Sequence, residues 1–367
     1  MEESFAEQIV PGTFIRVQAE GLIAPKGVAF GNVGIVGTAA AAAGASSLGT
    51  TQILSSLEDA YKVYAPSDAL SSGAQNLVRG LQLLFANGAR TVYARGVAAG
   101  ATQTDFEAGV AELLKEEVNV LVLPELAVGT ALSVLGSAAE TGENSGRDVL
   151  AVVGADAAQV ADMVAPPTDY AGPALPSNKR VVLCTPGVFA YDTAAKQEVA
   201  LPGTYTAAVV AGLIASLAPQ SSPTNKVLPG VVKLATKFGY GQLKNLLTHN
   251  VLPLEARQGV RVVRGITTEG AAFAQITTRR IVDYAKAGIR QVANPFVGRL
   301  NNERVRKALH GALDSFLTTM LVDEALVNYA LEVKASRQDE IAGRCVVNVA
   351  LQPTFSIDYI RVTLALS

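Results

Sequence analysis

Side chains that could perform acid–base or metal chemistry are scarce in this sequence. It has two histidines, His249 in a Leu-Leu-Thr-His-Asn segment and His310 in a charged, periodic stretch. A histidine-based catalytic triad or a zinc site would have to use one of them, and neither has a neighbouring ligand at metal spacing. We therefore interpret both as surface or helix-capping residues, and the sequence predicts no catalytic or metal site.

A glycine-rich run is the next candidate, because glycines let a backbone approach a phosphate closely. The run is Gly31-Asn-Val-Gly34-Ile-Val-Gly37. It does not match G-x-G-x-x-G, it has no P-loop lysine, and its other residues are mostly apolar. We favour a buried strand and predict no cofactor. A nucleotide-binding α/β enzyme remains an alternative.

Cysteines and charges restrict the class of protein further. Cys184 and Cys345 lie far apart in the sequence and have no ligand spacing, so we interpret them as buried apolar residues of a reduced, intracellular protein. Thirty Lys plus Arg against 32 Asp plus Glu give a net charge of −2, which predicts no direct binding of nucleic acid. Two uncharged windows, residues 27–57 and 203–218, are respectively too polar and too short to insert in a membrane.

Short basic clusters are the remaining charged feature. One is Arg279-Arg280, and the other comprises Arg304, Arg306 and Lys307. Solvated helix faces explain most such clusters. A helix with Arg304 and Lys307 on one face could instead dock on an acidic protein surface.

The elements that must position these residues alternate along most of the chain. Apolar runs and helical spacing predict strands at 28–37, 91–94, 119–123, 149–153, 180–184 and 261–266, with helices at 68–87, 104–117, 129–139 and 204–217. Such alternation predicts an α/β body, in which helices cover both faces of a parallel sheet.

A different pattern follows the α/β body. Two helices are expected at residues 277–291 and 301–322. After them, period-two alternation predicts a hairpin whose apolar face comprises Val327, Tyr329, Leu331, Val333, Val347, Val349 and Leu351. These elements predict a C-terminal α+β domain.

Both ends of the sequence have strand patterns without an evident partner. The N-terminal strand contains Thr13, Phe14, Ile15 and Val17. In the C-terminal strand the apolar phase slips by one residue, from Phe355, Ile357 and Tyr359 to Ile360, Val362 and Leu364. The slip indicates a bulge, or a bend where the strand leaves its own domain. An unpaired apolar strand promotes aggregation, so each arm must pair within its domain or with another chain.

Several segments, in order along the chain, resemble contractile tail sheath proteins. The opening Pro11-Gly-Thr-Phe-Ile-Arg-Val is similar to their Pro-Gly-Val-Tyr-Val. The segment Leu84-Phe-Ala-Asn-Gly-Ala-Arg is similar to their Phe-Phe-x-Asn-Gly-Gly, and Ala211-Gly-Leu-Ile-Ala to their Ala-Gly-x-x-Ala. The segment Phe296-Val-Gly-Arg-Leu-Asn and the closing Gln-Pro-Thr-Phe-Ser-Ile-Asp-Tyr-Ile-Arg-Val resemble their final domain.

The resemblance implies a structural role and no enzymatic activity. It implies a middle sheet that is subtilisin-like in fold only, and a division into an N-terminal arm (1–20), an α/β body (21–266), a C-terminal α+β domain (267–354) and a C-terminal arm (355–367). Each hairpin would be completed by the N-terminal strand of one neighbour and the C-terminal strand of another, giving an open helical homopolymer.

The implied partners are an inner tail tube, gripped by the helix that carries Arg304 and Lys307, together with baseplate and tail terminator proteins. On contraction such a sheath drives the tube through a target envelope. The location would be a virion tail, where the role is viral genome ejection, or an injection particle assembled in a bacterial cytoplasm. A closed oligomeric binding module that pairs its terminal strands internally is the other alternative.

Overall fold

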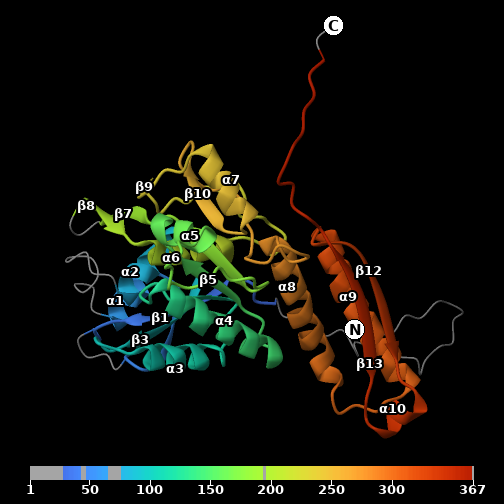
Figure 1. The fold of residues 1–367 in the computed structure, drawn as a ribbon. Helices are drawn as coiled ribbons and strands as arrows, with labels where there is room; N and C mark the ends of the chain where they lie inside the picture. Colours follow the sequence, from blue (N-terminus) through green and yellow to red (C-terminus); the bar gives the residue numbers. More distant parts are fainter. Residues whose placement is uncertain (1–27, 43–46, 65–75, 193–195, 366–367) are drawn as a thin grey trace, which may run out of the picture.

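The structure is a computed structural model that describes residues 28–42, 47–64, 76–192 and 196–365. The predicted N-terminal strand with Thr13, Phe14, Ile15 and Val17 lies outside these residues. The described chain forms an α/β body beside a smaller α+β layer, as predicted, and its C-terminal segment projects away from both (Figure 1).

The α/β body is organised around an eight-stranded sheet with the strand order β11-β10-β6-β5-β4-β1-β3-β2. Its six central strands are parallel, and β2 and β11 close the edges in antiparallel orientation. The strands are β1 (Asn32–Thr38), β2 (Thr51–Leu54), β3 (Thr91–Val97), β4 (Val120–Val122), β5 (Leu150–Gly154), β6 (Val181–Thr185), β10 (Leu252–Ala256) and β11 (Val260–Val262).

Helices cover both faces of this sheet because its central strands are apolar on both sides. One core joins α2 (Leu77–Ala86) and α6 (Gly203–Ser216) to the sheet, and the other joins α3 (Gln103–Leu113), α4 (Val128–Asn144) and α5 (Ala157–Val164) to the opposite face. Helix α6 is buried on nearly all sides, in agreement with its uncharged sequence. Shorter helices are α1 (Leu57–Val63) and α7 (Tyr240–Thr248).

Part of the body was not predicted. A three-stranded antiparallel sheet, in the order β8-β7-β9, comprises β7 (Val188–Asp192), β8 (Gln197–Leu201) and β9 (Lys233–Leu234). It packs beside α6 and encloses a buried ion pair, in which Arg79 Nη2 lies 2.8 Å from Asp192 Oδ2. Four further elements, β2, α1, α7 and β10, were likewise not predicted from the sequence.

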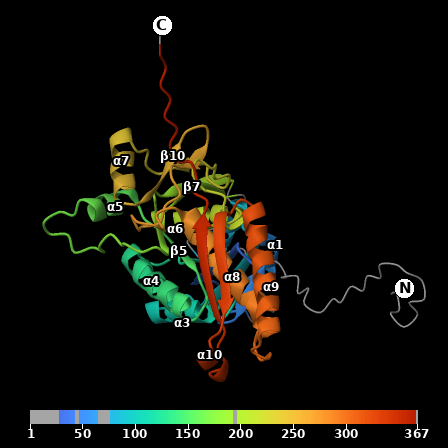
Figure 2. The same ribbon diagram turned by 90° about the vertical axis from the view of Figure 1, so that its right-hand side faces the viewer.

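The α+β layer consists of two long helices and a hairpin. Helix α8 (Ile276–Ala293) runs through the short 3-10 helix η3 (Asn294–Phe296) to α9 (Glu303–Val322). Strands β12 (Leu326–Lys334) and β13 (Val346–Pro353) form the hairpin, and α10 (Arg337–Ile341) lies in its turn. Figure 2 shows the hairpin lying against α9, and a separate hydrophobic core joins these elements to α8. No helix in the described part of the chain is long and apolar enough to cross a bilayer.

Candidate assembly surfaces

The β12–β13 hairpin has the apolar face that the sequence predicted. Its register places Tyr329 opposite Leu351, Leu331 opposite Val349, and Val333 opposite Val347. These side chains are half-buried against α9, and Tyr329 Oη donates a hydrogen bond to Asp314 Oδ1 at 2.8 Å. The helix thus holds the hairpin from one side.

Val327 was wrongly assigned to that apolar face. The register shifts between Leu326 and Asn328, so Leu326 takes the inward position. As a result, Leu326 is 3% exposed and Val327 is 59% exposed. Val327 therefore lies on the solvent side of the hairpin at the end nearest α9's C-terminus.

Both outer edges of the hairpin are open within the described residues, because β12 and β13 pair only with each other there. Each edge presents main-chain N–H and C=O groups that can accept a further strand. A two-stranded hairpin is only marginally stable without such pairing or a packing partner, and α9 provides the packing. The arrangement can receive one extra strand on each side.

The C-terminal segment after β13 does not form a strand in the single chain, although the sequence predicted one. Residues 354–365 are extended without a partner strand among the described residues, and their trace leaves the body in Figure 1. The apolar side chains Ile360, Val362 and Leu364 are 82%, 74% and 87% exposed. Ile357 and Tyr359 are also exposed, at 80% and 71%. A strand here requires a partner from outside the described chain.

The start of this arm is held against the body. Arg264 Nε donates to Asp358 Oδ2 at 2.7 Å, and the Asp358 side chain is 6% exposed. Gln275, the N-cap residue of α8, accepts a hydrogen bond from Ser356 N at 3.0 Å and donates to Ser356 O at 3.1 Å. Gln275 Nε2 also donates to Asp358 Oδ2 at 3.1 Å. These contacts place Ser356 and Asp358 against the junction between β11 and α8.

The basic residues of α9 lie where the sequence predicted, on a solvated face near the helix N-terminus. Arg304 and Lys307 are exposed. Lys307 Nζ lies 2.8 Å from Glu303 Oε1 in an ion pair whose side chains are 76% and 74% exposed. Such pairs add little stability, so this charge is available for a partner surface.

The Arg279-Arg280 pair, in contrast, is not a solvated helix face. The two residues are 2% and 7% exposed. Arg279 forms a two-bond contact with Asp283 and stacks on Phe273, with the guanidinium carbon 4.4 Å from the ring centre. Arg280 donates to three main-chain carbonyls, including that of Leu217 at 2.8 Å. The solvated interpretation was wrong because Arg279 is paired with Asp283 one turn along α8, and Arg280 finds carbonyl acceptors contributed by distant segments.

Asp283 also belongs to an ion-pair network that joins α8 to the body. Arg180 directly precedes β6, and its side chain is 1% exposed. It contacts Glu143, Asp148 and Asp283 at 2.9, 2.6 and 3.0 Å. From α8, Lys286 also reaches Asp148, and Arg290 contacts the same carboxylate at 2.9 Å. This network was not predicted from the sequence.

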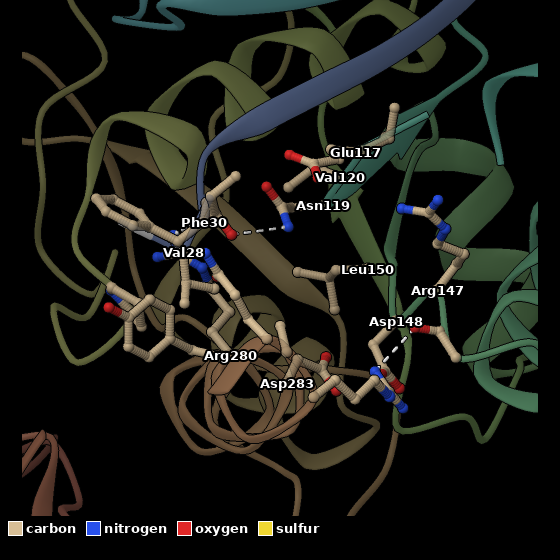
Figure 3. A pocket seen from close by; sticks show the side chains of 18 of the residues that line it. Val28, Phe30, Glu117, Asn119, Val120, Arg147, Asp148, Leu150, Arg280 and Asp283 are labelled. Atoms are coloured by element: carbon tan, nitrogen blue, oxygen red, sulfur yellow. Dashed lines mark hydrogen bonds and ion pairs between the residues drawn. The ribbon is translucent and has the colours of Figure 1, made fainter. Parts of the chain in front are cut away.

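A cavity of about 700 Å³ lies beside the network, between α8 and the amino ends of β4 and β5. Figure 3 shows Glu117 and Asn119 on one side of it and Arg147 on another, with Leu150 between them. Ligands of open α/β sheets bind at the carboxyl ends of the strands, the opposite edge. The lining residues include no histidine, cysteine or serine, and the carboxylates of Asp148 and Asp283 are held in the ion-pair network.

The residues considered as candidates for catalysis or phosphate binding have structural roles instead. His249 is the C-cap of α7, and its Nδ1 lies 2.9 Å from the Asn245 carbonyl oxygen. Gly34 and Gly37 lie within β1, and a Cβ on Gly31 would be 2.3 Å from the Ala215 carbonyl oxygen, so close packing on α6 explains that glycine. The described residues contain no cluster of side chains suited to a metal ion.

The two cysteines differ from each other. Cys184 is buried in β6, as predicted, and burial raises the pKa of its thiol. Cys345 is exposed, so its interpretation as a buried residue was wrong. It directly precedes β13, at the end of the hairpin turn.

The fold thus combines an α/β body with an α+β layer, and among the described residues it has a hairpin with open edges and a projecting arm. Two family models match it in succession, the phage tail sheath protein central domain at residues 99–268 and the phage tail sheath C-terminal domain at residues 268–367. Together they account for most of the chain, which therefore belongs to the phage tail sheath family.

Solved structures share this fold over almost the whole chain. A chain of the anti-feeding prophage baseplate has a TM-score of 0.75 at 18% identity, with 98% of this chain and 99% of that chain covered. The anti-feeding prophage helical sheath in its contracted state gives 0.71 at 19%, with 97% and 99% covered. A sheath tail protein from Listeria innocua gives 0.68 at 14%, with 92% and 94% covered. Among curated protein sequences no match was found.

Proposed function

We propose that this protein is the structural subunit of a contractile sheath, which polymerises helically around an inner tube and contracts to drive the tube through a target envelope. One observation carries the proposal. Among its described residues, the same chain has a hairpin with open edges and an exposed apolar arm that pairs with no other strand. Shared main-chain hydrogen bonds between copies satisfy both features at once.

In this assembly each hairpin receives two strands from neighbours. The C-terminal arm, with Ile357, Tyr359, Ile360, Val362 and Leu364, pairs with one edge of a neighbour's hairpin. The N-terminal arm, with Thr13, Phe14, Ile15 and Val17, pairs with the other edge in another neighbour. The acceptor face comprises Tyr329, Leu331, Val333, Val347, Val349 and Leu351, which α9 supports in each subunit. Repetition of this contact generates an open filament.

The tube is the second partner. Arg304 and Lys307 grip it in the extended state, and their exposure and positive charge on one face of α9 support this role. Baseplate and tail terminator proteins cap the two ends of the filament. The protein is accordingly not an enzyme, binds no nucleic acid directly and does not insert in membranes. It resides in a virion tail or in a bacterial injection particle.

The division of the chain follows from these roles. Residues 1–20 and 355–367 are the exchanged arms, residues 21–266 are the body, and residues 267–354 are the domain that accepts both arms. The family models change at residue 268, and the ion-pair network crosses that point, which supports two units that are tightly joined.

Negative-stain microscopy tests the proposal directly. The purified chain should form tubes, and deletion of either residues 1–20 or residues 355–367 should abolish them while circular dichroism stays unchanged. Uniform small particles from the intact chain and from both deletion variants would instead favour the closed oligomeric module. A thermal shift with ATP or NAD would favour the nucleotide-binding enzyme.

A further inference from the structure

The contacts at the start of the C-terminal arm form a defined cluster, which we name the arm clamp. It comprises Thr224, Arg264, Gln275, Thr277, Ser356 and Asp358. Asp358 is its centre, because its carboxylate faces Arg264, Gln275 and Thr224 together. Beyond it, Tyr359 packs over the guanidinium of Arg264, with the ring centre 5.5 Å away.

The clamp accounts for the phase slip in the arm's sequence. Ser356 and Asp358 face the body, whereas the odd-numbered Phe355, Ile357 and Tyr359 are 64%, 80% and 71% exposed. The same even-numbered side of an extended chain continues into Ile360, Val362 and Leu364. This side is therefore polar where it lies on its own body and apolar beyond Asp358, where it has no partner in the described chain. Of the two explanations for the slip, the change of partner fits without a bulge.

We infer that the arm clamp is a positioning device for assembly, in which Asp358 fixes the point and direction from which the arm reaches a neighbouring copy of this chain. The inference rests on the proposed strand exchange. It adds that the donor strand begins at Tyr359 and that its root stays bound to the donor's own body during exchange. Asp358 and Arg264 thereby act on pairing without contacting the acceptor hairpin.

The clamp also limits the reach of the arm. Fully extended, residues 359–365 span at most about 25 Å. Without the clamp, the nearest main-chain anchor is the bond from Thr354 N to Ala325 O, at 3.1 Å, and the released residues 355–365 span up to about 40 Å. The effective concentration of a tethered strand falls roughly as the −3/2 to −3 power of tether length, so release should weaken pairing about two- to fourfold.

The first measurement is made on single chains. Cys345 is exposed and Cys184 is buried, so a Thr363→Cys variant offers two accessible sites for spin labels, one on the hairpin turn and one on the arm. Labelled protein is diluted with unlabelled chain so that pulsed electron resonance reports distances within one chain. With the clamp intact we expect a narrow distribution, and with Asp358→Ala a broad one. An unchanged distribution would show that the clamp does not position the arm.

The second measurement is the critical concentration for tube formation, determined by sedimentation. Asp358→Ala and Arg264→Ala should each raise it by at most about two- to fourfold, because the bonds between Gln275 and Ser356 remain. The double variant should be no worse than Asp358→Ala because the two residues act through one contact. Lys62→Ala, which removes an exposed ion pair with Asp59 on α1, is the matched control and should leave it unchanged.

The outcomes separate this inference from the proposed function. If the distance distribution broadens and the critical concentration does not change, strand exchange can still hold and the clamp inference is wrong. If the chain lacking residues 355–367 assembles like the intact chain, strand exchange by this arm is itself wrong, and the clamp has no role in assembly.

Discussion

Arg180 and Asp283 lie in different parts of the fold and meet in a two-bond contact. The Nη1 and Nη2 atoms of Arg180 donate to the Asp283 carboxylate at 3.0 and 3.2 Å. Arg180 directly precedes β6 of the body, and Asp283 is in α8. Because the same guanidinium also contacts Glu143 and Asp148, one side chain connects the body sheet to the first helix of the C-terminal layer.

Replacement of Arg180 by Met should therefore destabilise the protein strongly. It removes the shared cation and leaves Asp148, 4% exposed, and Asp283 with less compensation. Loss of one partner from a buried ion-pair network typically costs about 3–5 kcal/mol. Urea denaturation followed by circular dichroism should show this loss as a lower midpoint.

Lys179→Met is the matched control for that prediction. Lys179 contacts only Glu143 in the network, at 3.0 Å, and its side chain is 38% exposed. Loss of this ion pair should lower the free energy of unfolding by less than about 1 kcal/mol. Equal effects of the two substitutions would contradict the assignment of Arg180 as the central residue.

Glu125 should make stability depend on pH near neutrality. It follows β4, and Thr38 at the end of β1 donates to its carboxylate through N, at 2.9 Å, and Oγ1, at 2.5 Å. Burial raises its pKa to about 7 despite these hydrogen bonds. The folded protein thus binds a proton that the unfolded chain releases near pH 4.5, so stability should fall as pH rises from about 4.5 to 7.

The test compares Glu125→Gln with the parent protein. The amide keeps an acceptor for Thr38 and cannot ionise, so this part of the pH dependence, on the order of 3 kcal/mol at most, should disappear. The urea midpoint is measured from pH 5 to 8. Glu140→Gln, on the exposed side of α4, should keep the parent's pH profile. A pH profile that Glu125→Gln leaves unaltered would contradict the prediction.

Strand exchange by the C-terminal arm predicts a specific effect of proline. In paired strands alternate N–H groups point to the partner, and proline removes that donor. Of Val362→Pro and Thr363→Pro, one should abolish tubes, and the other should be milder because its N–H faces away from the acceptor. Val362→Thr, which keeps the N–H and a β-branched side chain, should assemble. Microscopy that finds normal tubes in both proline variants would exclude main-chain pairing here.

The basic face of α9 predicts that sheath assembly on the tube depends on Arg304 and Lys307. Arg304→Glu combined with Lys307→Glu should prevent assembly of extended sheaths on the purified inner tube, because repulsion replaces attraction at the contact. Lys237→Glu combined with Lys244→Glu makes the same charge change on exposed residues at α7 and should be neutral. Extended sheaths of normal number and length in the α9 variant would refute the proposed tube contact.

The sequence predicts those parts of the fold in which a residue's environment follows from its near neighbours. The apolar run of β1 requires burial on both faces, and the uncharged segment of α6 requires a helix enclosed on nearly all sides. The alternation in β12 and β13 predicts which side chains meet across the hairpin. It fails at Val327, because a register shift depends on the partner strand and leaves no mark on local alternation.

The parts that could not be predicted depend on contacts between distant segments. Arg180 and Asp283 are separated by 103 positions, so the sequence gives two charges and no reason to pair them. The two-residue strand β9 is too short for a periodic signal. For α1, the sequence did contain a helix-start signal. Ser56 lies three positions before Asp59, and the Ser56 hydroxyl accepts a hydrogen bond from the Asp59 N–H.

The open hairpin edges have an evolutionary consequence. Main-chain groups are the same in every sequence, so a contact built from them tolerates the replacement of most surrounding side chains. The shared fold at 14–19% identity is compatible with such drift. Recognition by backbone alone would, however, also admit subunits from a related particle in the same cell. Side chains must then provide the specificity that prevents mixed filaments. We therefore expect the side chains of the arms and of the exposed α9 face to differ between lineages and to covary with those of their partner proteins.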